Sequence, residues 1–293
     1  MVFNETLLQY NEEVGQAIKE LFDLAEKNQK HENDILLIHL NGWKNQNLEQ
    51  GLRNKNYSPF MIGPGELGHC FHSIYELYDN YRRNIYNKSE ITVERQKEKD
   101  FINQEKASID IELLIYLKFW EADLILFKLY NLSQLAQGKP YDWELLNTKK
   151  ISNRRKLVRN YIQAPIKDIC PKFFQLIDET YSRQIRNAIA HSKYFHLYKT
   201  IYLANLNENE YYKLSNLKYE NWEIIFHKIL LLFNHIIQQI QSVNERKIAI
   251  AKNKHNGLPI NIPEKDKYKL NKVFWIKYDN ERKDWIWNNK VKC

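Results

Sequence analysis

One apolar stretch near the middle of the chain constrains the fold more than any other feature. Between residues 109 and 129 apolar side chains occur at nearly every helical angle, so a helix here has no polar side to turn toward water. Such a helix belongs in the centre of a helical bundle. The apolar residues are Ile109, Ile111, Leu113, Leu114, Ile115, Leu117, Phe119, Trp120, Leu124, Ile125, Leu126, Phe127 and Leu129.

Amphipathic stretches on both sides of this segment can supply the surrounding helices. One runs to about Lys30 after a cap at Asn4 or Thr6, and another runs from Asn221 to about Lys247. Eight glycines and seven prolines are few for 293 residues, which favours long helices. We therefore expect an all-α protein, an antiparallel helical bundle with additional N-terminal helices and one or two small β-hairpins.

The hairpins are expected where aromatic and β-branched residues gather. Residues 194–203 form one such run, with a return in residues 210–219, and residues 273–287 form another. Basic and aromatic residues interleave in the second run, which could stack nucleic-acid bases. Aromatic residues in hairpins also serve as cross-strand packing, and both interpretations stay open.

The net charge of +8 is unevenly distributed. Residues 149–199 carry twelve basic residues against three acidic ones, and residues 245–293 carry thirteen against six, whereas the first 148 residues are net acidic. This asymmetry indicates a polyanionic partner, most simply nucleic acid. A solvated lysine-rich surface explains the basic tail equally well.

The first basic segment contains Arg186, Asn187 and His191 close together. Asn187 and His191 are four residues apart and share a helix face, whereas Arg186 and His191 diverge by about 140°. The arginine and the histidine can edge one cleft only if the helix ends or loosens near His191. The apolar stripe before them predicts one continuous motif helix that begins at Pro171.

The run Arg-Asn-Ala-Ile-Ala-His at residues 186–191 resembles the R-x4-H signature of HEPN domains (higher eukaryotes and prokaryotes nucleotide-binding), including the polar residue after the arginine. The resemblance spans residues 101–241 and is strongest over about fifteen of them. It implies a helical bundle that pairs into homodimers and, in many members, a metal-independent endoribonuclease of prokaryotic defence or toxin systems. It divides the chain into an N-terminal helical extension (1–100), a HEPN-like bundle (101–244) and a basic C-terminal segment (245–293).

The chemistry of RNA cleavage without a metal assigns roles to these residues. A 2′-OH must lose a proton, the leaving 5′-oxygen must gain one, and the phosphorane needs stabilisation. We expect His191 to transfer protons, Arg186 to clamp the phosphate, and Asn187 to bind the phosphate or orient His191. Four basic residues would guide single-stranded or loop RNA: Arg154, Arg155, Arg159 and Lys193.

Glu121 and Asp123 interrupt the apolar helix, and burying an unpaired carboxylate is costly. Related HEPN domains hold the motif arginine with an acidic residue from a preceding helix, so the resemblance implies that one of the two contacts Arg186. Alternatively, the carboxylates reach solvent or pair with Lys118 or Lys128.

The motif at residues 186–191 has three other interpretations. Arg186 could form a structural ion pair while His191 only caps its helix, or the domain could bind nucleotides or RNA without cleaving. A third is a toxin silenced by a partner nucleotidyltransferase, whose HEPN subgroup has R-x4-H-x-Y. Here Lys193 occupies the tyrosine position and Tyr194 follows one residue later, so modification of Tyr194 is in doubt.

Cysteines and apolar runs indicate the compartment. Three scattered cysteines fit neither a disulfide framework nor a zinc cluster, and His69, Cys70 and His72 lack a second pair of ligands. No export signal is visible and no apolar run reaches membrane-spanning length. We expect a cytoplasmic protein without cofactor or metal, not associated with a membrane. Its expected partners are RNA and a second copy, and an antitoxin or regulatory protein is a further candidate.

Overall fold

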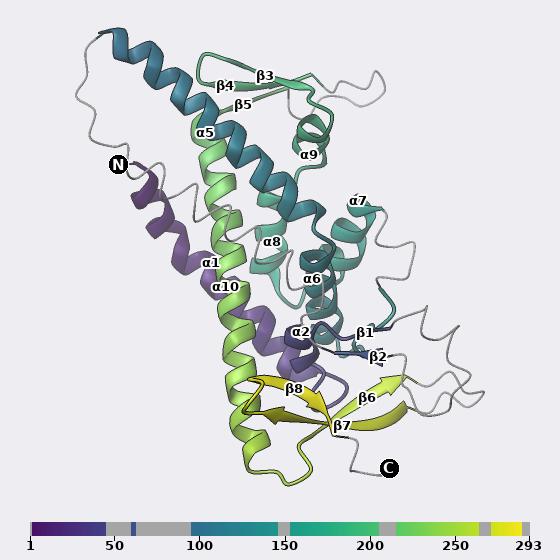
Figure 1. The fold of residues 1–293 in the computed structure, drawn as a ribbon. Coiled ribbons are helices and arrows are strands. Elements are labelled where there is room, and N and C mark those ends of the chain that lie inside the picture. The colour runs from purple at the N-terminus through teal and green to yellow at the C-terminus, as the bar shows by residue number, and fades with distance from the viewer. Residues whose placement is uncertain are drawn as a thin grey trace, which may run out of the picture.

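The computed structural model describes residues 2–44, 60–62, 95–145, 153–204, 215–263 and 271–288. These residues are largely helical, but they also form three small antiparallel sheets. The expected all-α class is therefore wrong, because short alternating segments pair into sheets at three places (Figure 1). The helical elements are α1 (Val2–Asn28), α2 (Leu36–Leu40), α5 (Arg95–Glu121), α6 (Asp123–Ala136), α7 (Arg154–Lys156), η2 (Leu157–Gln163), η3 (Ala164–Ile166), α8 (Pro171–Thr180), α9 (Arg183–Ala190) and α10 (Tyr219–Lys252).

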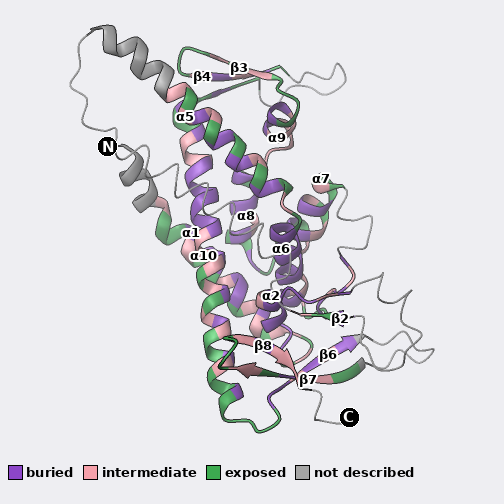
Figure 2. Cartoon of the chain, viewed as in Figure 1, coloured by how far each residue is buried: buried purple, intermediate pink, exposed green. Residues whose placement is uncertain are grey.

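Helices α1 and α10 form the long side of the molecule. They lie side by side and run in the same direction, so this pair departs from the expected antiparallel arrangement (Figure 1). Apolar residues at helical spacing, such as Ile18 and Leu21 of α1, are fully buried, as are Trp222 and Phe226 of α10. The buried side of α10 faces inward and its exposed residues lie on the outer edge (Figure 2).

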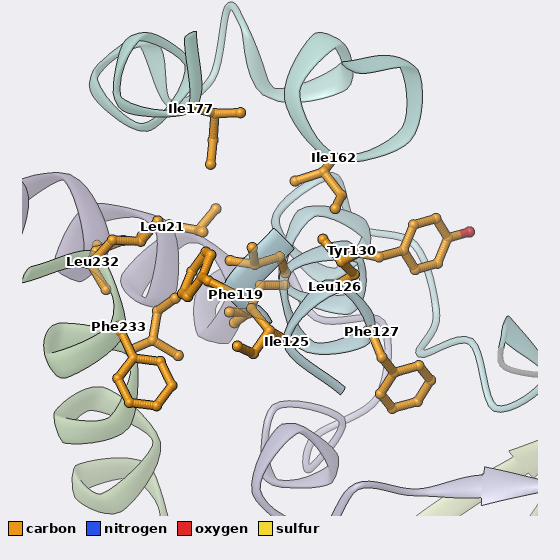
Figure 3. Packing of buried hydrophobic residues seen from close by; sticks show 14 of the residues in the cluster. Leu21, Phe119, Ile125, Leu126, Phe127, Tyr130, Ile162, Ile177, Leu232 and Phe233 are labelled. Carbon is orange, nitrogen blue, oxygen red and sulfur yellow. The ribbon is translucent and has the colours of Figure 1, made fainter. Parts of the chain in front are cut away.

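The central apolar segment is two helices rather than one. Ala122 has extended backbone angles (φ −69°, ψ 110°), so α5 ends at Glu121 and α6 begins at Asp123. Their side chains still fill the centre as expected, with Phe119 packed edge-to-face on Phe233 of α10. Figure 3 shows α1, α5, α6, α8, α10 and η2 contributing to this core through the labelled Leu21, Phe119, Ile125, Leu126, Phe127, Tyr130, Ile162, Ile177, Leu232 and Phe233.

The three sheets are small and lie at the edges of the helices. Residues 194–203, expected as one strand, fold into a hairpin whose turn contains Tyr198 at φ +51°. Residues 258–263 form a strand that the sequence did not lead us to expect. The strands are β1 (Trp43–Lys44) with β2 (Phe60–Met61), β3 (Tyr194–Leu197) with β4 (Thr200–Leu203) and β5 (Asn216–Lys218), and β6 (Leu258–Pro263) with β7 (Asn271–Asp279) and β8 (Asp284–Trp287).

The aromatic residues of the C-terminal sheet pack against each other. Phe274 contacts Trp287 and Tyr278 contacts Trp285, with ring centroids 5.8 and 5.6 Å apart. The Trp285 indole N–H also donates to Asn244 of α10 at 2.8 Å. These contacts favour cross-strand packing over base stacking at this sheet.

Buried residues from all three expected segments, from Val14 to Trp285, belong to one continuous core. The sequence also predicts a helix over residues 66–86, and this segment, which contains His69, Cys70 and His72, lies outside the described residues. Among the described helices, none combines the length and the apolar character needed to cross a bilayer.

Candidate phosphate-binding cleft

The expected motif helix is interrupted just before its arginine. Helix α8 ends at Thr180 and α9 begins at Arg183, while Tyr181 and Ser182 are extended. The Ser182 hydroxyl accepts a hydrogen bond from the Ile185 amide at 3.3 Å and so caps α9. The expectation of one continuous helix is therefore wrong, because a serine N-cap starts a new helix here.

A tyrosine from the central helix holds this break in place. The Tyr116 hydroxyl accepts from the Ser182 amide at 2.9 Å and donates to the Ser182 carbonyl at 3.3 Å. Complete burial raises the pKa of Tyr116 well above its usual value, so the hydroxyl keeps its proton at physiological pH. Tyr116 thereby fixes where α9 starts and where its side chains point.

The other end of α9 lies directly before His191. The helix ends at Ala190, and the amide of His191 donates to the Asn187 carbonyl at 3.1 Å. Asn187 and His191 therefore remain neighbours on one side of the helix end. The His191 side chain is exposed and has no hydrogen-bond partner among the described residues.

Arg186 is paired with Glu121, which answers the question of which carboxylate contacts it. Its Nε lies 3.2 Å from Glu121 Oε1, and its Nη2 donates to Asn187 Oδ1 at 3.0 Å. Its Nη1 is buried and has no hydrogen-bond partner in the described part of the chain. Its Nε likewise makes no hydrogen bond in the described residues and contacts Glu121 only as an ion pair, so two of its donor nitrogens are unused.

Asp123 pairs with a different arginine. Arg154 contacts Asp123 and also lies 3.5 Å from Glu121, so it joins the two helices across the break at Ala122. The side chains of Glu121 and Asp123 are 40% and 52% exposed, because the break turns them out of the core. Neither charge is therefore buried, and neither pairs with Lys118 or Lys128 in the described contacts.

These side chains surround a hollow of about 470 Å³, which we call the arginine cleft. It lies between α7, α9 and the end of α5, and α7 and α9 are on the same side of the molecule (Figure 1). Four arginines and one carboxylate line it, so its charge is strongly positive. The lining residues are Glu121, Asn153, Arg154, Arg155, Arg183, Arg186 and Asn187.

Two of the lining residues were missed in the sequence. Arg183 lies three residues before Arg186, a spacing that places both on one helix face and could have identified it. Asn153 accepts a hydrogen bond from the Lys156 amide at 3.1 Å and caps α7. That cap begins the short helix that carries Arg154 and Arg155, which both line the cleft.

Arg159, expected to guide RNA, lies away from the cleft. Its guanidinium donates to Asp178 at 2.6 Å, to Gln163 at 2.7 Å and to the Tyr181 carbonyl at 2.7 Å. Its plane also lies over the Tyr181 ring, 5.3 Å from the centroid. These contacts join η2, which has a π-helical turn, to the segment before α9.

The remaining expected residues follow α9 and do not line the cleft, and His191, expected to transfer protons, is one of them. Lys193 is exposed. Tyr194 donates to Asp110 of α5 at 3.0 Å, and burial together with this bond raises its pKa to about 12. The Tyr194 hydroxyl is thus bonded to α5 and does not face the cleft.

The described residues contain no group of three or more potential metal ligands. Comparisons with protein-family models, with curated proteins and with solved structures found no match to this chain.

Proposed function

We propose that this protein is a metal-independent endoribonuclease that cleaves single-stranded or loop RNA by attack of a 2′-OH. The observation that carries the proposal is the arginine cleft, in which Arg186 is fixed by Glu121 while its Nη1 has no partner in the described chain. A guanidinium presents a planar fork that matches phosphate oxygens. The cleft therefore suits a phosphodiester.

The reaction divides between the cleft and the end of α9. As the 2′-oxygen bonds to phosphorus, His191 takes its proton as general base, or gives one to the departing 5′-oxygen as general acid. The products are a 2′,3′-cyclic phosphate and a free 5′-OH. Arg186 stabilises the charge on the phosphorane. Asn187, whose Oδ1 accepts a hydrogen bond from Arg186, holds the guanidinium toward the phosphate.

One chain supplies only one such histidine, and two proton transfers are needed. His191 is exposed at the end of α9, so a second copy can approach it. A two-fold dimer that apposes two α9 ends would place an imidazole on each side of one phosphate. We therefore propose that the active form is a homodimer.

The HEPN resemblance supports a role as a toxin or antiviral defence effector in the cytoplasm. A partner antitoxin or regulatory protein would then restrain it. Modification of Tyr194 by a partner nucleotidyltransferase is less well supported, because its hydroxyl is bonded to Asp110.

Incubation of purified protein with total RNA tests this function. We expect cleavage that persists in chelator, fragments that end in 2′,3′-cyclic phosphate, and no cleavage by His191→Ala. Chelator-sensitive cleavage, or full activity of His191→Ala, would show that another site does the chemistry.

A second candidate is a non-catalytic module that binds RNA or nucleotides. It is favoured by the position of His191, which does not line the arginine cleft. Tight RNA binding by the wild-type protein, without cleavage of any RNA in the total pool, would support this candidate and reject the nuclease.

A further inference from the structure

The sheet that follows His191 presents two different faces. On the inner face, His196 contacts Asp110 at 3.0 Å and Tyr219 at 2.7 Å, which attaches β3 to α5 and α10. Ile201 and Leu203 of β4 are buried on the same side. Because side chains alternate along a strand, the residues between them point away from the helices.

The outer face carries exposed aromatic and apolar residues. Phe195 is 52% exposed, Leu197 47% and Tyr198 82%. The Phe195 ring stacks on Tyr202, its cross-strand neighbour, at 5.3 Å and nearly parallel. We call Phe195, Leu197, Tyr198 and Tyr202 the aromatic face.

Lysines surround the aromatic face. Lys193 precedes β3, and Lys218 lies opposite Thr200 on β5. Lys199 lies in the turn, 3.8 Å from the carboxylate of Glu105 on α5. Residues 191–204 and 215–218 contain no aspartate or glutamate. The face is therefore apolar at its centre and has lysines at its edges, of which Lys199 shares its charge with Glu105, and this arrangement suits the flat bases and the phosphates of a single-stranded nucleic acid.

The aromatic face continues directly from the proposed active site. Strand β3 begins three residues after His191, and the Lys193 amide donates to the Ala188 carbonyl of α9 at 2.7 Å. Lys193 therefore lies in the chain between the end of α9 and the first strand of the sheet.

We infer that the aromatic face binds the bases of single-stranded RNA next to the cut phosphate, an inference that rests on the proposed ribonuclease function. Single strands offer base faces for stacking, whereas a duplex keeps its bases stacked on each other. Two copies of the face apposed by a two-fold axis would bring lysines of both copies together, which disfavours self-association here.

Binding measurements in the His191→Ala background test this inference without cleavage. The probes are a fluorescent 12-nucleotide oligouridylate and an RNA duplex of equal length. Phe195→Leu removes the ring and keeps an apolar side chain, and Tyr198→Asn keeps a residue that tolerates positive φ. Each should weaken single-strand binding about tenfold and leave duplex binding unchanged. Ile250→Ala, an exposed position on α10, should change neither.

Several outcomes separate this inference from the function beneath it. If the His191→Ala protein without a further substitution does not bind single-stranded RNA, and the wild-type protein does not cleave RNA, the proposed function itself is rejected. If the wild-type protein cleaves RNA but Phe195→Leu and Tyr198→Asn bind single strands as tightly as Ile250→Ala does, only the role of the aromatic face in base binding is rejected. Loss of a dimer in these variants by sedimentation also rejects it and assigns the face to a contact between copies.

A cross-linking measurement does not depend on the variants folding. The His191→Ala protein is irradiated with an oligonucleotide that contains 4-thiouridine and is then digested for mass spectrometry. Cross-linked peptides should contain residues 194–203. Cross-links confined to other segments would overturn the inference.

Discussion

Arg159 and Arg186 are both partly buried and both lie beside the break between α8 and α9, yet their guanidinium groups differ in how many hydrogen-bond partners they have. Arg159 donates to Asp178, Gln163 and the Tyr181 carbonyl, and these contacts close the joint between η2 and α8. Arg186 lines a cleft together with three other arginines, and its buried Nη1 has no hydrogen-bond partner in the described part of the chain. The difference teaches that basic charge locates a region, whereas unused donors locate a site within it.

The largest effect is expected at Arg186. Arg186→Ala should lower the cleavage rate at least about a hundredfold, because charge on the phosphorane loses a fixed partner. Its free energy of unfolding should fall by less than about 1 kcal/mol, because Glu121 is partly exposed and still has Arg154 nearby.

Cleavage rates and urea denaturation of the same preparations measure these two effects. Arg186→Lys keeps the charge without the planar fork and should lie between wild type and Arg186→Ala. A large loss of stability in Arg186→Ala would assign the residue to the structural ion pair instead.

Arg159 should show the opposite pattern. Arg159→Ala leaves the Tyr181 carbonyl and Gln163 without their donor, so the free energy of unfolding should fall by about 2 kcal/mol. Cleavage at low temperature, where the variant stays folded, should remain within a few-fold of wild type. A hundredfold loss of cleavage in a stable Arg159→Ala protein would return Arg159 to the RNA path.

The sequence predicted the bundle core better than the points where helices stop. Apolar periodicity correctly indicated the buried sides of α1 and α10. It could not indicate the break at Ala122, since alanine is a strong helix former and the ion pairs on both sides of the break come from Arg154, which is distant in sequence. Ser182 was a recognisable N-cap, but the uninterrupted apolar stripe outweighed it.

The prediction of an all-α fold was wrong for a similar reason. Leu258, Ile260 and Ile262 alternate with less buried residues, which is the pattern of a half-buried strand. Pro259 and Pro263 in the same segment favour a loop, although proline is compatible with the edge strand that β6 forms. Within the site, charge pattern identified Arg154 and Arg155 but could not separate them from Arg159.

Tyr116 controls where α9 begins and should show an intermediate effect. Tyr116→Phe removes both hydrogen bonds to Ser182, so we expect a loss of about 1–2 kcal/mol in the free energy of unfolding. Cleavage should fall several-fold, because Arg186 is less well positioned. Thermal unfolding and cleavage rates measure both, and an unchanged rate with unchanged stability would remove Tyr116 from the positioning role.

The smallest effect is expected at Arg155, which is exposed at the edge of the cleft. Arg155→Ala should weaken single-stranded RNA binding a few-fold and reduce the slope of log affinity against log salt by about 0.7. Lys252→Ala, a matched charge removal at the end of α10, should leave the slope unchanged. Equal slopes for the two variants would mean that RNA does not follow this edge of the cleft.

The most direct measurement uses one RNA with a single 2′-deoxynucleotide on the 5′ side of the mapped cut. The account predicts that wild-type protein binds this RNA as tightly as the all-ribose strand and no longer cuts it at that bond, because the attacking hydroxyl is absent. Cleavage of the deoxy-substituted bond at the all-ribose rate would contradict the mechanism assigned to Arg186 and His191.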